Sequence, residues 1–282
     1  MNKTTVLAIA LGVLSALSGE SRASDKPVAP IKSESSFKSS APTKVTKPTA
    51  ALRLARYWGK QHGLSTSEIE EQATAIEESK ARTSGPSHEG HVVADRFNFK
   101  YKALGIPTGS KRNAIIIRSN QPAPENLVEL ALAAKKVGIA PSEVAILNLR
   151  AENNVEGTYI RSYAKSEYAD EKMVGQFRTE NMRILDHTIP RRDQVVKMLS
   201  MLTDPNIKLV VIHCKAGRAR TGIMVALQRI VLDGWSVDDA LAEAADKGLR
   251  RPLQKAFVEH FAADWKAGKI QLATRSTKAQ EI

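Results

Sequence analysis

The sequence predicts an α/β fold, a single mainly parallel sheet flanked by helices, with a helical extension on its N-terminal side. Beyond residue 92, short β-rich runs alternate with helical ones, which is the pattern of a parallel sheet with crossover helices. The run KLVVI at 208–212 is continuously apolar, as suits a strand buried on both faces. The composition, 42% apolar and 26% charged, is that of a globular protein.

The individual elements follow from periodicity and from their end signals. Pro124 at a first turn and Gly138 after a last turn bound one helix,. Ser236 caps another. Strands are expected at 114–118, 144–149, 182–185 and 208–212, and helices at 124–137, 167–181, 192–202, 221–233, 237–246 and 252–266,.

The first residues have the features of a secretory signal peptide. Lys3 supplies the positive charge, residues 6–17 form an apolar core, and Ser21-Arg22-Ala23 is a small-x-small cleavage site,. We expect cleavage after Ala23 and a periplasmic or secreted protein. A membrane anchor needs about 20 apolar residues, so no membrane span is expected.

Changes in composition divide the remaining chain into a linker, a helical extension, a main domain and a tail. Residues 24–50 are rich in Ser, Lys, Pro and Thr without any period, which predicts a disordered linker. Residues 51–91 are expected to form a helical extension, with Ser65 and Glu68 as a capping box,. The main domain is expected at 92–270, followed by a flexible tail at 271–282.

The net charge and the number of cysteines limit the partners, disulfides and metal sites that the chain can have. The 42 basic and 30 acidic residues give a net charge of +12, which favours an anionic partner or substrate. The single cysteine, Cys214, excludes an intramolecular disulfide and a multi-cysteine zinc site. We expect no metal and no cofactor.

The segment HCKAGRARTG at 213–222 directly follows the apolar strand and precedes a helix. A tight loop in that position points successive backbone N–H groups into one concavity at the positive end of the helix dipole. Such a nest accommodates a phosphate or a sulfate. The residues assigned to phosphate binding are Lys215, Ala216, Gly217, Arg218, Ala219 and Arg220.

Cys214 is the candidate nucleophile, because the positive field of this loop favours the thiolate form. Arg220 can hold two phosphate oxygens through its planar fork. Thr221 offers a hydroxyl to the sulfur when it becomes the leaving group. His213 is expected to orient the loop from behind rather than to bind a metal.

The segment HCKAGRARTG resembles the Cys-x5-Arg-Thr signature of the cysteine-dependent protein tyrosine and dual-specificity phosphatases. RS-x-QP at 118–122 and Asn148-Leu149-Arg150 resemble the framework of a bacterial, often exported, dual-specificity-like branch. The resemblance implies the phosphatase type of α/β fold. It also implies that Cys214 attacks phosphorus to form a phosphocysteine, that Arg220 holds the equatorial oxygens, and that an upstream aspartate protonates the leaving oxygen and then activates water.

For that acid the sequence favours Asp186, in LDHTIP after a predicted strand. Its spacing from Cys214 is similar to that of the family. Asp193 and Glu180 remain alternatives: Asp193 would open the next helix, where it could act as a cap, and Glu180 precedes the strand.

Lys215 and Arg218 bear on the substrate. Cations at these two positions resemble the lipid-phosphatase variant of the signature, as in the phosphatase-and-tensin group, where they meet further phosphates of an inositol ring. The substrate is therefore expected to be a phosphotyrosine protein, or an inositol phosphate or phosphoinositide, with a phytase-like inositol polyphosphate phosphatase as the specific alternative. Bacterial cysteine phytases usually carry HCEAG, from which Lys215 departs.

Three other functions fit the sequence less well. A rhodanese-like sulfurtransferase also uses a cysteine between strand and helix, but without this Cys-x5-Arg-Thr spacing. A non-catalytic module that binds a phosphorylated ligand would not need the full set of chemical residues. Nucleic acid is expected to bind only non-specifically, through charge.

Overall fold

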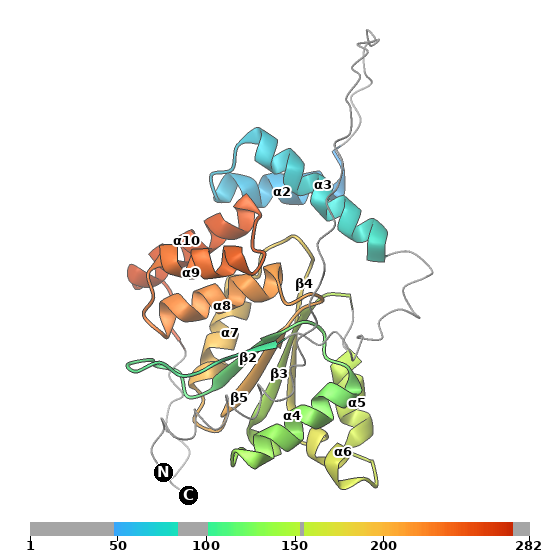
Figure 1. Cartoon of the computed structure of the whole chain (residues 1–282). Coiled ribbons are helices and arrows are strands. Elements are labelled where there is room, and N and C mark those ends of the chain that lie inside the picture. The colour runs from blue at the N-terminus through green and yellow to red at the C-terminus, as the bar shows by residue number, and fades with distance from the viewer. Residues whose placement is uncertain (1–47, 84–100, 153–154, 273–282) are drawn as a thin grey trace, which may run out of the picture.

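The computed structural model describes residues 48–83, 101–152 and 155–272 (Figure 1). One sheet has the strand order β1-β2-β5-β3-β4. Its strands are β1 (Tyr101–Leu104), β2 (Ile115–Ser119), β3 (Val144–Arg150), β4 (Arg178–Ile184) and β5 (Leu209–His213). β1 pairs antiparallel with β2, and the other neighbours pair parallel. The α/β fold with a mainly parallel sheet is therefore confirmed.

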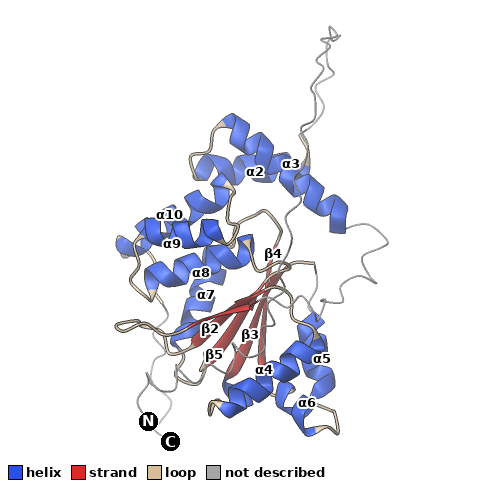
Figure 2. Cartoon of the chain, viewed as in Figure 1, coloured by secondary structure: helices blue, strands red, loops and turns tan. Residues whose placement is uncertain are grey.

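Helices cover both faces of the sheet (Figure 2). They are α4 (Pro124–Lys136), α5 (Val155–Tyr163) and α6 (Ala169–Val174) on one face, and α7 (Arg192–Thr203), α8 (Ala219–Val231), α9 (Val237–Asp246) and α10 (Pro252–Lys266) on the other. A short 3-10 turn, η3 (Pro141–Glu143), precedes β3.

The two layers follow from alternation along the strands. In β5, Val211 joins the core under α4 and α6, whereas Val210 and Ile212 join the core under α7, α8 and α10. Successive side chains of a strand point to opposite faces, so a strand covered on both sides must be apolar throughout. The burial of every residue of β5 meets this requirement.

One expected helix is wrong over much of its length. The helix predicted at 167–181 ends at Val174, and β4 begins at Arg178, four residues before the strand expected at 182–185. β4 is an edge strand with a polar, partly exposed first half, so it lacks the apolar signal of an interior strand. The helix α5 and the strand β1 were not predicted.

The extension forms two helices, α2 (Ala50–Gln61) and α3 (Thr66–Thr83). They pack on each other through a small apolar cluster of Ala51, Ala55, Ile69, Ala73 and Ile76. The expected capping box is present, because the Ser65 amide donates to Glu68 (2.8 Å) and the Glu68 amide to Ser65 Oγ (3.4 Å). In Figure 1 the pair lies over α10.

The expected signal peptide (1–23), all but the last three residues of the linker (24–50), residues 84–91 of the extension, residues 92–100 of the main domain and most of the tail lie outside the described residues. Within the described part of the chain, no helix is long and apolar enough to cross a membrane.

Candidate active site

The loop from Cys214 to Arg218 connects the end of β5 to the first turn of α8. Because β2, β5 and β3 run parallel, their carboxyl ends meet at one edge of the sheet. The loop therefore lies between the segments that follow β2 and β3. The loop directly precedes the N-terminus of α8, the positive end of the helix dipole, where an anion is favoured.

Contacts with the segment around the end of β2 fix the conformation of the loop. The Gln121 amide donates to the carbonyl of Lys215 (3.2 Å), and Arg118 Nη2 donates to the carbonyl of Gly217 (3.0 Å). These bonds engage two carbonyl oxygens, the loop groups that would repel an anion. Gly217 has φ +66°, and a Cβ there would lie 2.6 Å from the backbone of Ser119, so only glycine fits.

Arg220 is almost completely buried, with 1% of its surface exposed. Its Nη1 donates to both carboxylate oxygens of Glu152 (3.0 and 2.9 Å) and to the carbonyl of Ile184 (3.1 Å). Its Nε has no hydrogen-bond partner among the described residues, although Asp186 Oδ1 lies 3.4 Å away. One edge of the guanidinium is thus fixed by the protein, and its Nε can donate to a ligand.

The pKa of Arg220 depends on burial and on three neighbouring residues. Burial by itself lowers the pKa of Arg220, but its interactions with Cys214, Asp186 and Glu152 outweigh burial and raise the pKa above its usual value. Arg220 therefore stays cationic inside the domain. The sequence predicts Cys214 and Arg220 as the reacting pair, and the structure buries both and places the partly exposed Asp186 beside Arg220.

Of the three candidate acids, Asp186 alone contacts Arg220. It lies just after β4 with 32% of its side chain exposed. Asp193 lies on the first turn of α7, 68% exposed and paired with Arg191 at 2.9 Å, an ion pair that lowers the pKa of Asp193. Glu180 pairs with Lys197 at 2.7 Å. The geometry favours Asp186, because the two alternatives are held in other ion pairs.

His213 and Thr221 lie beside the loop and are fully buried. His213 Nδ1 is 3.4 Å from the carbonyl oxygen of Cys214, and its Nε2 is 3.7 Å from Glu156 Oε1. Burial lowers the pKa of His213 to about 3, so its imidazole is neutral at pH 7. The Thr221 hydroxyl has no hydrogen-bond partner among the described residues.

The structure adds residues to which the sequence assigned no role. Glu152 follows β3 and holds Arg220. Arg118 and Arg150 are buried, and burial lowers the pKa of each, with Cys214 among the neighbours that partly offset this effect. Three buried arginines therefore lie near one thiol, with Glu152 and Asp186 as the carboxylates beside Arg220. The only sequence signal for Glu152 was its place just after the mostly apolar strand at 144–149.

A basic cavity of about 340 Å³ adjoins the loop on the side of β1 and β2. It is lined by the loop residues 216–218 and by four cations, Lys102, Arg118, Arg218 and Lys247. Asp246 also lines it and pairs with Lys247. Arg218 and Lys215 are exposed, so a ligand can reach both.

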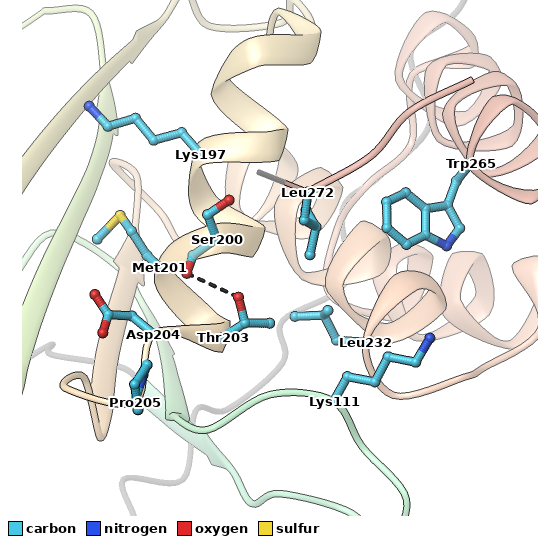
Figure 3. A pocket seen from close by; sticks show the side chains of 10 residues that line it. All are labelled: Lys111, Lys197, Ser200, Met201, Thr203, Asp204, Pro205, Leu232, Trp265 and Leu272. Atoms are coloured by element: carbon cyan, nitrogen blue, oxygen red, sulfur yellow. Dashed lines mark hydrogen bonds between the residues drawn. The ribbon is translucent and has the colours of Figure 1, made fainter. Parts of the chain in front are cut away.

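A second cavity, of about 550 Å³, is shown in Figure 3. Its lining includes Lys111 before β2 and Asp204 before β5, so it lies at the end of the strands opposite to the loop. Figure 3 shows Trp265, Leu232 and Leu272 on one side of it and Met201 and Lys197 of α7 on the other. None of the predicted site residues line it. In the three described stretches of chain, no group of three His, Cys, Asp or Glu side chains could hold a metal ion.

A family model described as a DSP-PTPase phosphatase fused to NAD+ kinase matches residues 142–260, the segment that contains Asp186, Cys214 and Arg220. No curated protein matches the sequence.

Several crystal structures are similar to the chain at low identity. Tk-PTP in a mutant form is 22% identical, with a TM-score of 0.42 over 59% of this chain and 97% of that one. TpbA from P. aeruginosa is 19% identical, with a TM-score of 0.36 over 56% and 89%. The catalytic core of the PP-IP phosphatase SIW14 from S. cerevisiae is 20% identical, with a TM-score of 0.37 over 56% and 90%.

Proposed function

We propose that residues 142–260, which match a family model described as a DSP-PTPase phosphatase fused to NAD+ kinase, form a cysteine-dependent phosphatase domain that hydrolyses phosphomonoesters through a phosphocysteine intermediate. The observation that supports this most directly is the buried guanidinium of Arg220, fixed by Glu152 through Nη1 and unpartnered at Nε. A guanidinium in that state donates to the equatorial oxygens of a phosphoryl group as charge develops on them.

The reaction proceeds in two steps. The thiolate Sγ of Cys214 forms a bond to phosphorus while the bond from phosphorus to the ester oxygen breaks, and Asp186 donates its proton to that oxygen. In the second step the Asp186 carboxylate takes a proton from water as the water oxygen attacks phosphorus. The S–P bond breaks and phosphate leaves. Thr221 can donate a hydrogen bond to the departing sulfur.

We infer that the preferred substrate carries a second phosphate, as an inositol phosphate or a phosphoinositide does. The basic cavity supports this, because Lys102, Arg218 and Lys247 surround a space of about 340 Å³ that opens next to the phosphate loop. A ring with several phosphates gains attraction from each added cation, in both affinity and encounter rate. A single phosphotyrosine would leave these cations unused.

The site of action is proposed from the N-terminal sequence alone. Lys3, the apolar run at 6–17 and the cleavage site at Ala23 favour export to the periplasm or the medium. N-terminal sequencing of the protein recovered from the periplasmic fraction of a bacterial host tests this, with Ser24 as the expected first residue.

A phosphate-release panel tests the substrate. It compares a soluble inositol polyphosphate, phosphoinositide vesicles and a phosphotyrosine peptide, with p-nitrophenyl phosphate as the reference. The double variant Lys102→Gln/Lys247→Gln should lower kcat/KM for the inositol polyphosphate about tenfold or more and leave p-nitrophenyl phosphate within about twofold. The charge-matched control on α4, Lys135→Gln/Lys136→Gln, should change neither. A phosphotyrosine peptide that reacts fastest in the wild type would contradict the preference.

A further inference from the structure

Two buried glutamine side chains hold consecutive carbonyl groups of the loop that carries Asp186. Gln72, on α3 of the extension, donates from Nε2 to the carbonyl of His187. Gln254, on α10, donates from Nε2 to the carbonyl of Thr188 (3.2 Å). Gln72 is 2% exposed and Gln254 is fully buried. The loop from Leu185 to Pro190 is therefore held from two different helices, one of which lies far away in the sequence.

The conformation of this loop needs such support. His187 has φ +59°, a left-handed conformation that is unfavourable for a side chain with a Cβ. Its amide donates to Oδ1 of Asp186 (3.1 Å), the same oxygen that lies 3.4 Å from Nε of Arg220. The strained residue and the direction of the Asp186 carboxylate are thus linked through one oxygen atom.

The presence of a glutamine at the buried position 72 indicates that its amide group has a role. Position 72 lies on the buried face of α3, next to Ala73, Ala75 and Ile76, all of which are buried. A buried amide is unfavourable unless it is hydrogen-bonded, a cost that an apolar side chain would not carry. The partner of the Gln72 amide is the carbonyl of His187.

The extension is fixed to the domain by contacts away from this loop. Glu71 pairs with Arg251 at 2.6 Å. His62 Nδ1 lies 2.8 Å from His260 Nδ1, and its ring packs edge-on against Phe257. All three partners belong to α10 or to the residue before it, so the extension is attached to the helix that also carries Gln254.

We propose that the helical extension contributes a residue to the active site. This residue is Gln72, a positioning residue that keeps the Asp186 carboxyl group directed at the leaving oxygen. Gln72 does not touch the reacting atoms and acts through His187. This inference rests on the proposed function, because it assumes Asp186 as the proton donor.

The proposal makes a kinetic prediction that depends on the leaving group. Phenolate is a poor leaving group and needs a proton from Asp186, whereas p-nitrophenolate leaves almost unaided. A positioned acid contributes 10²–10⁴-fold to the rate. When the loop is no longer held by Gln72, kcat for phenyl phosphate should fall about tenfold, while kcat for p-nitrophenyl phosphate should stay within about twofold of the wild-type value.

The variant Gln72→Met keeps the length of the side chain and removes the amide donor, and Gln72→Ala removes the side chain as well. Thr74→Ala, on the exposed face of the same helix, is the matched control. Each full-length variant is made alone and in an Asp186→Asn background, and thermal unfolding reports whether it folds. If Gln72→Ala does not fold, Gln72→Met provides the same comparison.

The positioning role is supported if either Gln72 variant lowers kcat for phenyl phosphate and leaves kcat for p-nitrophenyl phosphate nearly unchanged. Thr74→Ala should change neither value. In the Asp186→Asn background, Gln72→Met should lower kcat for phenyl phosphate no further. Equal loss for both substrates, no loss at all, or an effect that multiplies with Asp186→Asn would overturn the positioning role. Failure of the proposed function would look different, because the wild type would then hydrolyse neither ester or Cys214→Ser would retain activity.

Discussion

Glu152 places both carboxylate oxygens within 3.0 Å of one nitrogen of Arg220, the Nη1 atom. The two residues come from neighbouring segments at the carboxyl edge of the sheet, Glu152 after β3 and Arg220 in the first turn of α8 after β5. The pair is mostly buried, with 1% of the Arg220 side chain and 16% of the Glu152 side chain exposed. Glu152 therefore determines which edge of the guanidinium remains available to a phosphate.

Replacing Glu152 should impair catalysis more than folding. In Glu152→Gln, Asp186 is left as the carboxylate partner of Arg220, so the guanidinium is drawn toward the acid and away from the phosphate. A misplacement of about 1 Å can cost about 10²-fold, and we expect kcat/KM for p-nitrophenyl phosphate to fall by about that factor. Steady-state kinetics test this.

The control for this variant is Glu259→Gln, on the exposed surface of α10, which should retain full activity. If Glu152→Gln unfolds at a lower temperature but retains its kcat/KM, then the pair with Arg220 serves stability alone.

Gly217 should not tolerate a side chain. Gly217→Ala would place a Cβ 2.6 Å from the Ser119 backbone at φ +66°, so either the loop or the end of β2 must move. We expect loss of phosphate binding together with destabilisation of about 2–4 kcal/mol, from strain and steric overlap combined.

Gly109→Ala separates these two causes. Gly109 has φ +79° with nothing within 4 Å of its Cβ position, so this variant carries the conformational cost alone, about 1 kcal/mol. Denaturant unfolding and the inhibition constant for inorganic phosphate measure both effects. Equal behaviour of the two variants would show that the loop does not need the close approach to Ser119.

The raised pKa of Glu156 predicts that the free energy of unfolding depends on pH. Burial raises the pKa of Glu156 from 4.5 to about 7, so the folded protein holds this proton more tightly than the unfolded chain does. The resulting stabilisation is complete below pH 4.5 and is lost as the pH rises through 7. A shift of this size corresponds to roughly 3 kcal/mol.

The comparison is between wild type and Glu156→Gln, by urea unfolding at pH 5 and pH 8.5. His213, whose lowered pKa acts in the opposite direction at acid pH, is present in both proteins and cancels. The wild type should lose roughly 2–3 kcal/mol relative to the variant over this interval. Parallel curves would mean that Glu156 is ionised in the folded protein at both pH values.

The central part of the site could be predicted from the sequence because its residues lie close together along the chain. Cys214, Arg220 and Thr221 lie within one strand–loop–helix segment, and the same segment orients them all. Glu152 is separated from Arg220 by more than one element, and its role depends on β3 lying next to β5 in the sheet, an order that periodicity does not reveal.

Gln72 was still less accessible to prediction. A single polar residue on a helix is usually solvated, and only the docking of α3 on α10 and on the Asp186 loop buries it. β4 was misjudged for a related reason. Its polar residues face solvent at the edge of the sheet, so the amino acids there do not show the apolar alternation that marks a strand.

The most direct test of the central claim is mass spectrometry of the enzyme quenched during turnover of p-nitrophenyl phosphate. The variant Asp186→Asn suits it, because the good leaving group allows the first step while the missing base slows attack by water on the intermediate. The account predicts one phosphoryl group on the peptide that contains Cys214, and none in the Cys214→Ser protein. Turnover without any phosphoryl group on Cys214, or with one on another residue, would contradict it.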